Sequence, residues 1–458
     1  MPILLKGVNR YGDPASRLHV KAMYISSTAR SSVLNVVQGA ITTGRLDIEE
    51  NGEVYCYGQV VNDCKPIRLR VLDDNFWMRV AMSGGLGFSE AYMAGEIEVS
   101  DITGILELFI DNLSLVSNVA SIYGRLAAKL TSLSNSFINQ SRFTARLNAI
   151  ASYDQSNDIF QAFLSKEMMY SCALWSGEED GVDGDLTHGP TSDDLEKAQK
   201  RKLHRVLQQA RVKPGHRILE FGSGWGGLAI EARLRTAARS YGCEVDTFTL
   251  SIEQKTLAEE RIREAGLEDR IRVHLRDYRD IPAEFENSFD AFISIEMLEH
   301  VGPKWYNTYF KTVDFALKKR NATAVVCSST FPEGRYSDYQ AEDFMRRYMW
   351  PGSSLPSATV LINAAHAGSQ GRFTLNHVEN HGAHYPRTLR TWGRRLKANL
   401  SQDLIARTYP ALKDDIQFRM FLRKWEYQFA YAGAGFTKGY LTCHMLTFTR
   451  TDDPSPLV

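Results

Sequence analysis

The fold of this chain is decided by residues 217–229, which read RILEFGSGWGGLA. An apolar strand ends there in an acidic residue, and a glycine-rich turn then leads into a helix. Glycines let the backbone of such a turn approach a ligand closely, and the following helix presents its N-terminal NH groups. The glycines at 222, 224 and 226 do not match the spacing of the dinucleotide fingerprint. The pattern therefore favours S-adenosylmethionine, a nucleoside cofactor without a pyrophosphate.

Strands and helices alternate around this stretch. Short apolar runs that are expected to form strands occupy residues 217–220, 244–250, 271–275, 289–295 and 323–328. Helical segments separate them, and this alternation is typical of a parallel sheet with helices on both faces. Two further strands, 373–379 and 440–449, are expected to be antiparallel at the edge. The sequence thus predicts an α/β, Rossmann-like fold with a mostly parallel, seven-stranded sheet.

A smaller α+β module is expected before this sheet. Alternating residues flank the pair Asn51-Gly52, which is a strong hairpin signal. A strand at 67–72 follows, and then short helices on either side of a glycine pair at 84–85. Apolar residues at helical spacing over 102–134 indicate amphipathic helices, which either pack between domains or contact a membrane.

These patterns divide the chain into three parts. Residues 1–40 show little period and are expected to form a loosely ordered, flexible lead-in. An N-terminal α+β domain with a helical linker should span 41–145, and the catalytic domain should span 146–458. Within the catalytic domain, residues 177–196 are acidic and rich in turn-forming residues. We expect a surface insertion there and assign no chemistry to it.

Composition limits the partners and the compartment. The 458 residues hold 54 basic and 54 acidic side chains, and this balance argues against nucleic-acid binding. Six cysteines stand apart without metal-ligand spacing, which favours reduced thiols in a cytoplasmic protein without a metal site. No window approaches the ~20 apolar residues that a membrane span needs. A protein of this kind that acts on lipid would associate transiently with the membrane surface, without a transmembrane segment.

Polar residues or glycines stand at the carboxyl ends of four of the predicted strands, either as the last residues of the strand or just after it. In an open α/β sheet, ligands bind beyond the carboxyl ends of the strands. Each residue alone can be explained as a strand-end cap, but four such ends in order on one sheet point to a cofactor site. They are Glu220, Gly222 and Gly224 after the first strand, Thr249 and Gln254 after the second, Asp277 and Tyr278 after the third, and Glu299 and His300 after the fourth.

Five motifs occur in order along the chain. They are YDQSNDIF at 153–160, MYSCALW at 169–175, the glycine turn, SIEMLEHVG at 294–302 and WPGSSLPS at 350–357. With them the chain resembles the cyclopropane-fatty-acyl-phospholipid synthases and mycolic acid cyclopropane synthases, over residues 44–450. The resemblance implies a class I methyltransferase fold behind an N-terminal domain, with S-adenosyl-L-methionine as cofactor.

The resemblance also implies roles for single residues. Tyr170 and Ser171 match cofactor contacts from the segment that covers the site. The remaining cofactor contacts that it implies are Gly222, Gly224, Thr249, Gln254, Asp277 and Tyr278.

Methyl transfer to an alkene leaves a carbocation, and ring closure then requires a base. In the family a bicarbonate ion fills this role. Cys172 (through its backbone), Glu299 and Tyr385 match three of the bicarbonate ligands. His300, beside Glu299, is a second candidate for a proton acceptor, or else a residue that merely starts a helix.

One position departs from the family pattern. Many members have a histidine in a Leu-Leu-His-Thr-Ile run, whereas this chain reads VVCSST at 325–330. Cys327 or Ser329 is the alternative donor to bicarbonate there. The departure favours methylation without ring closure, on an acyl chain or on a small-molecule amine.

The sequence therefore leaves three functions open. The leading one is cyclopropane formation at a cis double bond of a phospholipid acyl chain, catalysed at the membrane surface. Methylation without ring closure is the second, and a non-catalytic lipid-binding protein is the third. The complete glycine turn and the Tyr170-Ser171-Cys172 segment argue against the third. Since family members often dimerise, a homodimer is one expectation that the sequence leaves open.

Overall fold

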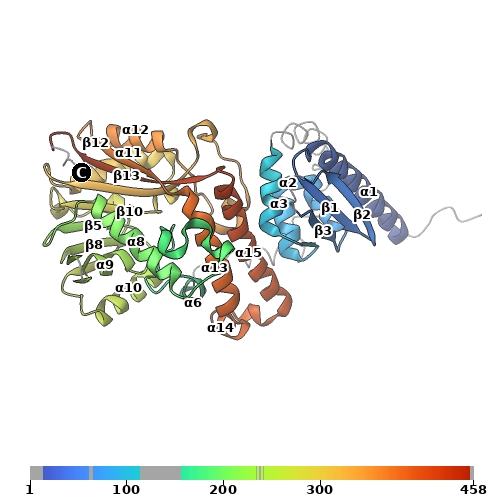
Figure 1. Cartoon of the computed structure of the whole chain (residues 1–458), viewed down its shortest axis with the longest axis horizontal. Helices are drawn as coiled ribbons and strands as arrows, with labels where there is room; N and C mark the ends of the chain where they lie inside the picture. Colours follow the sequence, from blue (N-terminus) through green and yellow to red (C-terminus); the bar gives the residue numbers. More distant parts are fainter. Residues whose placement is uncertain are drawn as a thin grey trace, which may run out of the picture. The chain divides into compact units, whose positions relative to one another are not determined.

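The computed structural model describes residues 14–60, 65–113, 156–233, 235–236, 239–240 and 242–453. The predicted helical stretch beyond residue 113, the linker to residue 145 and residues 153–155 of the first motif lie outside this range. The chain divides into two compact units, Met1–Asn148 and Ala149–Val458. Figure 1 shows both units, with most of their helices and strands labelled.

The first unit contains a four-stranded sheet with the order β2-β1-β3-β4. Its strands are β1 (Arg45–Glu50), β2 (Glu53–Gly58), β3 (Ile67–Val71) and β4 (Ile97–Val99). The predicted hairpin is confirmed, because β1 and β2 pair in antiparallel fashion. Its turn residues Asn51 and Gly52 have φ angles of 51° and 84°, in the left-handed region that a two-residue hairpin turn requires.

The helices described in this unit are α1 (Pro14–Ala40), α2 (Asn75–Ala94) and α3 (Ile102–Asp111). α2 is interrupted where Gly84 has φ 54° and ψ −125°, at the break that the sequence predicted. Over residues 14–40 the structure differs from the expected loosely ordered lead-in, since they form α1. Its buried positions include Ala29, Val33 and Ala40, and such small side chains give only a weak helical pattern.

The second unit contains a seven-stranded sheet with the order β12-β13-β11-β10-β5-β8-β9. Its strands are β5 (Arg217–Phe221), β8 (Glu244–Thr249), β9 (Ile271–Leu275), β10 (Ala291–Ile295), β11 (Thr323–Thr330), β12 (Phe373–Asn380) and β13 (Thr442–Arg450). β13 runs antiparallel to β11 and β12, and the other neighbouring pairs are parallel. This topology confirms the predicted α/β fold, including the antiparallel pairing at one edge.

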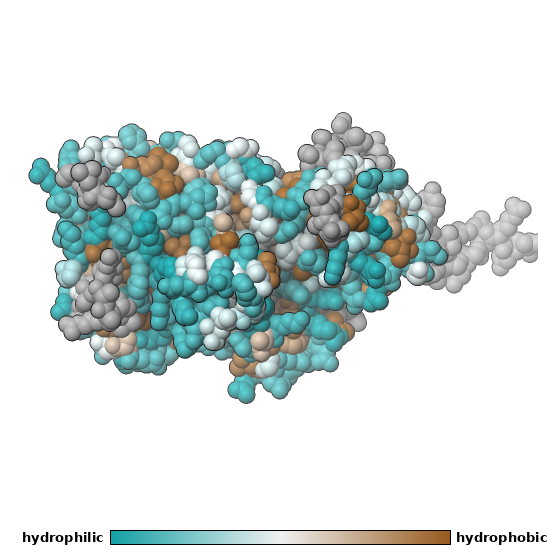
Figure 2. Space-filling model, viewed as in Figure 1, coloured by the Kyte–Doolittle hydropathy of each residue, from teal (hydrophilic) through white to brown (hydrophobic). Residues whose placement is uncertain are grey.

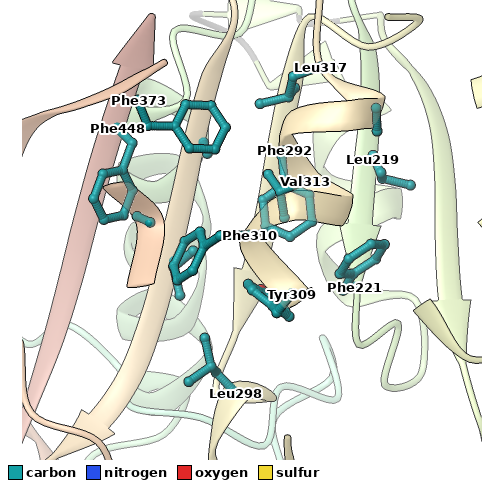
Figure 3. Close-up of a cluster of buried hydrophobic side chains, with 14 of the residues drawn as sticks. Leu219, Phe221, Phe292, Leu298, Tyr309, Phe310, Val313, Leu317, Phe373 and Phe448 are labelled. Atoms are coloured by element: carbon teal, nitrogen blue, oxygen red, sulfur yellow. The ribbon is translucent and has the colours of Figure 1, made fainter. Parts of the chain in front are cut away.

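Helices cover both faces of this sheet. One apolar cluster involves α8 (Asp194–Gln209), α9 (Gly227–Arg233) and α10 (Ile252–Glu264), and another involves α11 (Tyr306–Ala316) and α12 (Ala358–Gly368). Successive residues of β5 alternate between the clusters, since Ile218 joins the first and Leu219 joins the second. In the second cluster Phe292 of β10 lies among side chains of α11 such as Phe310 and Val313 (Figure 3).

A helical group lies beside the sheet (Figure 1). It consists of α6 (Asn157–Phe163), α13 (Tyr385–Asn399), α14 (Gln402–Thr408) and α15 (Asp415–Thr437). α13 packs against both α6 and α15. Because β12 leads into α13 and α15 leads into β13, this group connects the edge strand β12 to its neighbour β13.

Residues 177–196 are not the free surface insertion that the sequence indicated. They form η1 (Gly177–Glu179), η2 (Gly181–Asp183), α7 (Gly184–Thr187) and the start of α8. The side chain of Asp185 is only 1% exposed and accepts hydrogen bonds from Arg390 (2.7 Å) and Arg394 (2.8 Å) of α13. Asp194 likewise accepts from Arg387 at 2.9 Å. The acidic composition of the segment is thus balanced by arginines about 200 residues later in the chain.

Within the described residues, no helix combines the length and apolar character needed to cross a membrane. On the face shown in Figure 2, hydrophilic residues dominate and hydrophobic residues occur in separate small groups.

Candidate active site

The glycine turn lies at the carboxyl end of β5, just before α9. Gly222 and Gly224 have φ angles of 92° and 48°, a conformation that favours glycine. The backbone NH of Gly222 donates to the carbonyl of Phe248 on the neighbouring strand at 3.0 Å. A Cβ atom built on Gly224 would meet no atom within 4 Å, so the turn borders open space. The turn therefore leaves room for the ligand that the sequence predicts.

The first motif meets the glycine turn in space. Trp225, inside the turn, donates its indole NH to Oδ1 of Asn157 at 2.7 Å. The ring of Phe160 lies 4.8 Å from that of Trp225. α6 is therefore fixed beside the turn, and two motifs that are distant in the sequence form one wall.

Glu220 precedes the turn and is almost completely buried, with 3% of its surface exposed. Its Oε2 atom has no hydrogen-bond partner among the described residues. Burial raises the pKa of this carboxyl to about 8, although a hydrogen bond with Thr247 and the charge of Lys202 act in the opposite direction. A positively charged ligand beside the open turn would lower this pKa again and pair with the unsatisfied carboxyl oxygen. S-adenosylmethionine carries such charge on its sulfonium and ammonium groups.

The end of β8 brings two predicted cofactor residues together. The hydroxyl of Thr249 donates to Oε1 of Gln254 at 2.8 Å. Gln254 lies in the first turn of α10, whose N-terminus is capped by Ser251. Thr249 and Gln254 thus form one polar group at the carboxyl edge of the sheet, as a ribose contact requires.

The end of β9 carries Asp277 and Tyr278, and both are already engaged. The Asp277 carboxylate accepts hydrogen bonds from the backbone NH and from Nη2 of Arg279, at 2.9 and 2.6 Å. The Arg279 side chain lowers the pKa of Asp277. The ring of Tyr278 lies 5.5 Å from the rings of Phe221 and Tyr309, so it packs on the core. These two residues stand at the predicted edge, with Tyr278 turned toward the sheet.

Tyr170 and Ser171 lie in the loop between α6 and η1. The ring of Tyr170 lies 5.1 Å from the rings of both Phe160 and Trp392. Ser171 is 2% exposed, and its Oγ accepts a hydrogen bond from Nζ of Lys202 at 2.6 Å. Tyr170 therefore belongs to an aromatic cluster, whereas the Ser171 hydroxyl is held by α8.

A second group centres on the partly buried Glu296, a residue to which neither the motifs nor the resemblance assigned a role. The backbone NH of Cys172 donates to Oε1 of Glu296 at 2.8 Å, and the hydroxyl of Tyr385 donates to Oε2. Sγ of Cys443 lies 3.8 Å from Oε1. Phe436 stacks on Tyr385 with ring centroids 4.2 Å apart. Two predicted catalytic residues, Cys172 and Tyr385, thus meet on one carboxylate.

Glu299 lies one turn further on, in η5 (Leu298–His300), and is 7% exposed. Its Oε1 accepts the backbone NH of Ser329 at 2.5 Å, and its Oε2 has no hydrogen-bond partner in the described part of the chain. Burial and then the charge of Glu296 raise the pKa of Glu299 to about 8. His300 is exposed, and no hydrogen bond between described residues joins it to either glutamate. The structure therefore places the Glu299 carboxyl near that of Glu296, which holds Cys172 and Tyr385, and leaves His300 apart.

Lys202 on α8 supplies positive charge to these acidic groups. It is 3% exposed, and burial lowers its pKa, while the charge of Glu296 acts to raise it. No local pattern indicates this role, because Lys202 ends the basic run at 197–202 and resembles any solvated helix position. Glu296 did leave a signal, since it is the first of two carboxylates in the fourth motif.

The donors of this group do not fit a separate bicarbonate ion. The Cys172 NH and the Tyr385 hydroxyl, which the resemblance assigned to bicarbonate, both donate to Glu296. The backbone NH of Ser329, the alternative donor, is taken by Glu299. A side chain of the protein thus stands where the resemblance placed the ion.

Comparison with known proteins decides the family. A family model described as mycolic acid cyclopropane synthetase matches residues 140–446. The chain belongs to this family. It is 33% identical over 383 residues to the tuberculostearic acid methyltransferase UfaA1 of Mycobacterium tuberculosis (strain ATCC 25618 / H37Rv), covering 82% of this chain and 81% of the relative. It is 30% identical over 397 residues to the cyclopropane-fatty-acyl-phospholipid synthase of Escherichia coli (strain K12), covering 86% of this chain and 90% of the relative.

A solved structure of the family has the same fold. The crystal structure of the mycolic acid cyclopropane synthase CmaA1 complexed with SAH and CTAB aligns with a TM-score of 0.51 at 23% identity, covering 67% of this chain and 98% of that one. The predicted class I methyltransferase fold is confirmed. As a member of this family, the protein is an S-adenosylmethionine-dependent methyltransferase, as the sequence predicted.

Proposed function

We propose that this methyltransferase transfers the methyl group of S-adenosylmethionine to a cis double bond of a phospholipid acyl chain and closes a cyclopropane ring. The enzyme would act as a peripheral protein at the membrane surface. The observation that carries this proposal is the hydrogen-bonded carboxylate group formed by Glu296, Tyr385 and Cys172. Transfer to a heteroatom that sheds its own proton needs no such base, whereas ring closure from a carbocation does.

The residues around the glycine turn are suited to hold the cofactor. Gly224 borders the open space, Glu220 offers its unpaired Oε2 to positive charge, and Thr249 with Gln254 offers polar atoms to a ribose. Bound S-adenosylmethionine supplies an electrophilic methyl group. The protein's part is to keep that methyl group in line with the double bond and to exclude water.

Aromatic rings are suited to stabilise the positive charge that develops on the acyl chain. Tyr170 lies in the segment that the resemblance places over the cofactor. Its ring centroid is 6.0 Å from that of Trp350 and 5.1 Å from that of Trp392. The negative face of an aromatic ring attracts a cation by about 0.5–2 kcal/mol, and more strongly in a dry site. Such a cluster also offers apolar surface to a hydrocarbon chain.

Methylation of the acyl chain without ring closure is the second candidate. A relative named tuberculostearic acid methyltransferase supports it, at 33% identity over 82% of this chain. Cys327, in the position of the family histidine, also supports it, because burial raises the pKa of this thiol and keeps it from acting as a base. Removal of a proton from a carbon of the chain, instead of from the added methyl group, would give this product.

The test uses the full chain with isotopically labelled cofactor and vesicles of an unsaturated phospholipid, with fully saturated vesicles as the control. We expect label in the unsaturated acyl chains and a gain of one CH2 by mass spectrometry. A ring and a methyl-branched alkene have the same mass, so mild hydrogenation follows: the ring resists it and the alkene takes up hydrogen. Label on a soluble amine, or none on unsaturated chains, would contradict the proposal.

A further inference from the structure

We propose that the carboxylate of Glu296 is the base of the ring-closing step, so that this enzyme needs no bicarbonate ion. The inference rests on the proposed function, in which a proton must leave the added methyl group. It assigns a catalytic role to a residue of the chain itself, in place of the ion that the family resemblance implied.

The hydrogen-bond donors of the site carry the argument. The backbone NH of Cys172 and the hydroxyl of Tyr385 converge from two distant segments, and both oxygens of Glu296 accept one of these bonds. The Sγ atom of Cys443 reaches Oε1 from a third segment, β13. Donors arranged around a planar three-atom O–C–O group suit bicarbonate and a carboxylate equally, and here the carboxylate belongs to the protein.

The surroundings also favour a negative charge on Glu296 over one on Glu299. Burial raises the pKa of Glu296, and the bonds from Tyr385 and Cys172 and the charge of Lys202 oppose this rise without cancelling it. Glu299 accepts a single described hydrogen bond, from the Ser329 backbone. Two interacting carboxyls ionise one after the other, and the charge settles on the one with more donors. Glu299 therefore holds the proton while Glu296 stays ready to accept one.

The backbone at this residue is strained in a way that marks function. Glu296 has φ 50°, in the left-handed region that residues with a Cβ atom rarely adopt. Such a conformation is strained and persists where the surroundings impose it, often at active sites. It directs the side chain from the end of β10 into the group formed by Cys172 and Tyr385.

The proposed step balances as follows. The π electrons of the alkene form a bond to the methyl carbon as the bond from that carbon to sulfur breaks, which leaves a carbocation on the chain. Glu296 takes a proton from the added methyl group, and the electron pair of that C–H bond closes the ring. The Glu296 carboxyl then returns its proton to water when the product leaves. No oxidant or reductant is needed.

The decisive variant is Glu296→Gly, because glycine tolerates φ 50° and leaves the donors of Cys172 and Tyr385 free. In bicarbonate-free buffer the wild type should turn over at the same rate with and without added bicarbonate. Glu296→Gly should lose about 100-fold or more in turnover and regain part of it when bicarbonate is added. Glu296→Gln should lose as much without rescue, since the amide fills the space. The exposed Glu284→Gln is the matched control.

Binding of ¹³C-bicarbonate, followed by NMR, gives a readout that does not depend on turnover. We expect no binding to the wild type and binding to Glu296→Gly. Bicarbonate binding or dependence in the wild type, or full turnover of Glu296→Gly without bicarbonate, would overturn the proposal. Failure of the proposed function is a separate result: the wild type would then label no unsaturated chains, while the binding data still report what fills the site.

Discussion

Glu299 is the residue to which the family resemblance assigns a catalytic role, yet its surroundings keep it neutral. Its carboxyl accepts the Ser329 NH, and burial beside Glu296 raises its pKa to about 8. At neutral pH it is therefore protonated, and a glutamine would resemble it in charge and shape. The two glutamates of the fourth motif should respond differently to the same substitution.

For Glu299→Gln we expect turnover within about tenfold of the wild type at neutral pH, because an amide oxygen can still accept the Ser329 bond. Affinity for the cofactor, measured by calorimetry, should be unchanged. The matched variant is Glu296→Gln, with its far larger expected loss. A loss of about 100-fold in Glu299→Gln would return the role of base to Glu299.

Gly224→Val should abolish cofactor binding. Gly224 has φ 48° and its Cβ position faces open space, so a branched side chain would be strained and would enter the proposed cofactor space. Calorimetric titration with S-adenosylmethionine measures the loss. Gly266→Val is the control, since Gly266 also has a left-handed φ of 66° and nothing near its Cβ position, but follows α10 away from the turn. Unaltered affinity in Gly224→Val would place the cofactor elsewhere.

At the scale of whole elements, local patterns sufficed where the partners of a residue are its neighbours in sequence. The strands of the large sheet and the hairpin at Asn51-Gly52 were predicted, because apolar runs and turn residues are local signals. The role proposed for Glu296 could not be predicted in this way, because its hydrogen-bond donors come from the loop after α6 and from the start of α13. Residues 177–196 were misjudged for the same reason, since an acidic segment looks solvated until its arginines are placed.

The contact between α7 and α13 should be a major source of stability. Burial would raise the pKa of Asp185, but hydrogen bonds from Arg390 and Arg394 lower it below its usual value. Asp185→Asn leaves two guanidinium groups without their buried partner. Breaking a buried pair in this way costs on the order of 3–5 kcal/mol. Urea unfolding should show a loss of that size in the free energy of unfolding.

The control for this variant is Asp183→Asn. The Asp183 side chain is 72% exposed and lies 3.8 Å from Arg390, so the same change of charge should cost no more than about 1 kcal/mol. Equal effects of the two variants would mean that net charge, and not the buried contact, stabilises the segment.

The whole molecule contains carboxyls whose pKa values move in opposite directions on folding. Burial raises the pKa of Glu220 and that of Glu299 to about 8. For Asp246 and Glu379, hydrogen bonds from arginine and histidine side chains outweigh burial and lower the pKa to about 2. A carboxyl of the first kind stabilises the fold fully below its unfolded pKa and loses that contribution as pH rises through the folded value. One of the second kind loses its contribution as pH falls through about 2. Of these four carboxyls, only those of the first kind therefore change the free energy of unfolding between pH ~4.5 and ~8.

Glu220→Gln isolates one such carboxyl, because glutamine stays neutral at every pH. The free energy of unfolding of the wild type should fall more steeply than that of the variant between pH ~4.5 and ~8, with a constant difference outside this window. Urea unfolding at a series of pH values measures it, and the transition to follow is that of the second unit, which holds Glu220. His384, whose pKa burial lowers to about 4, titrates alike in both proteins and cancels in the difference. Parallel curves would mean that folding does not shift the pKa of Glu220, which would contradict the burial of its carboxyl without a hydrogen-bond partner for Oε2.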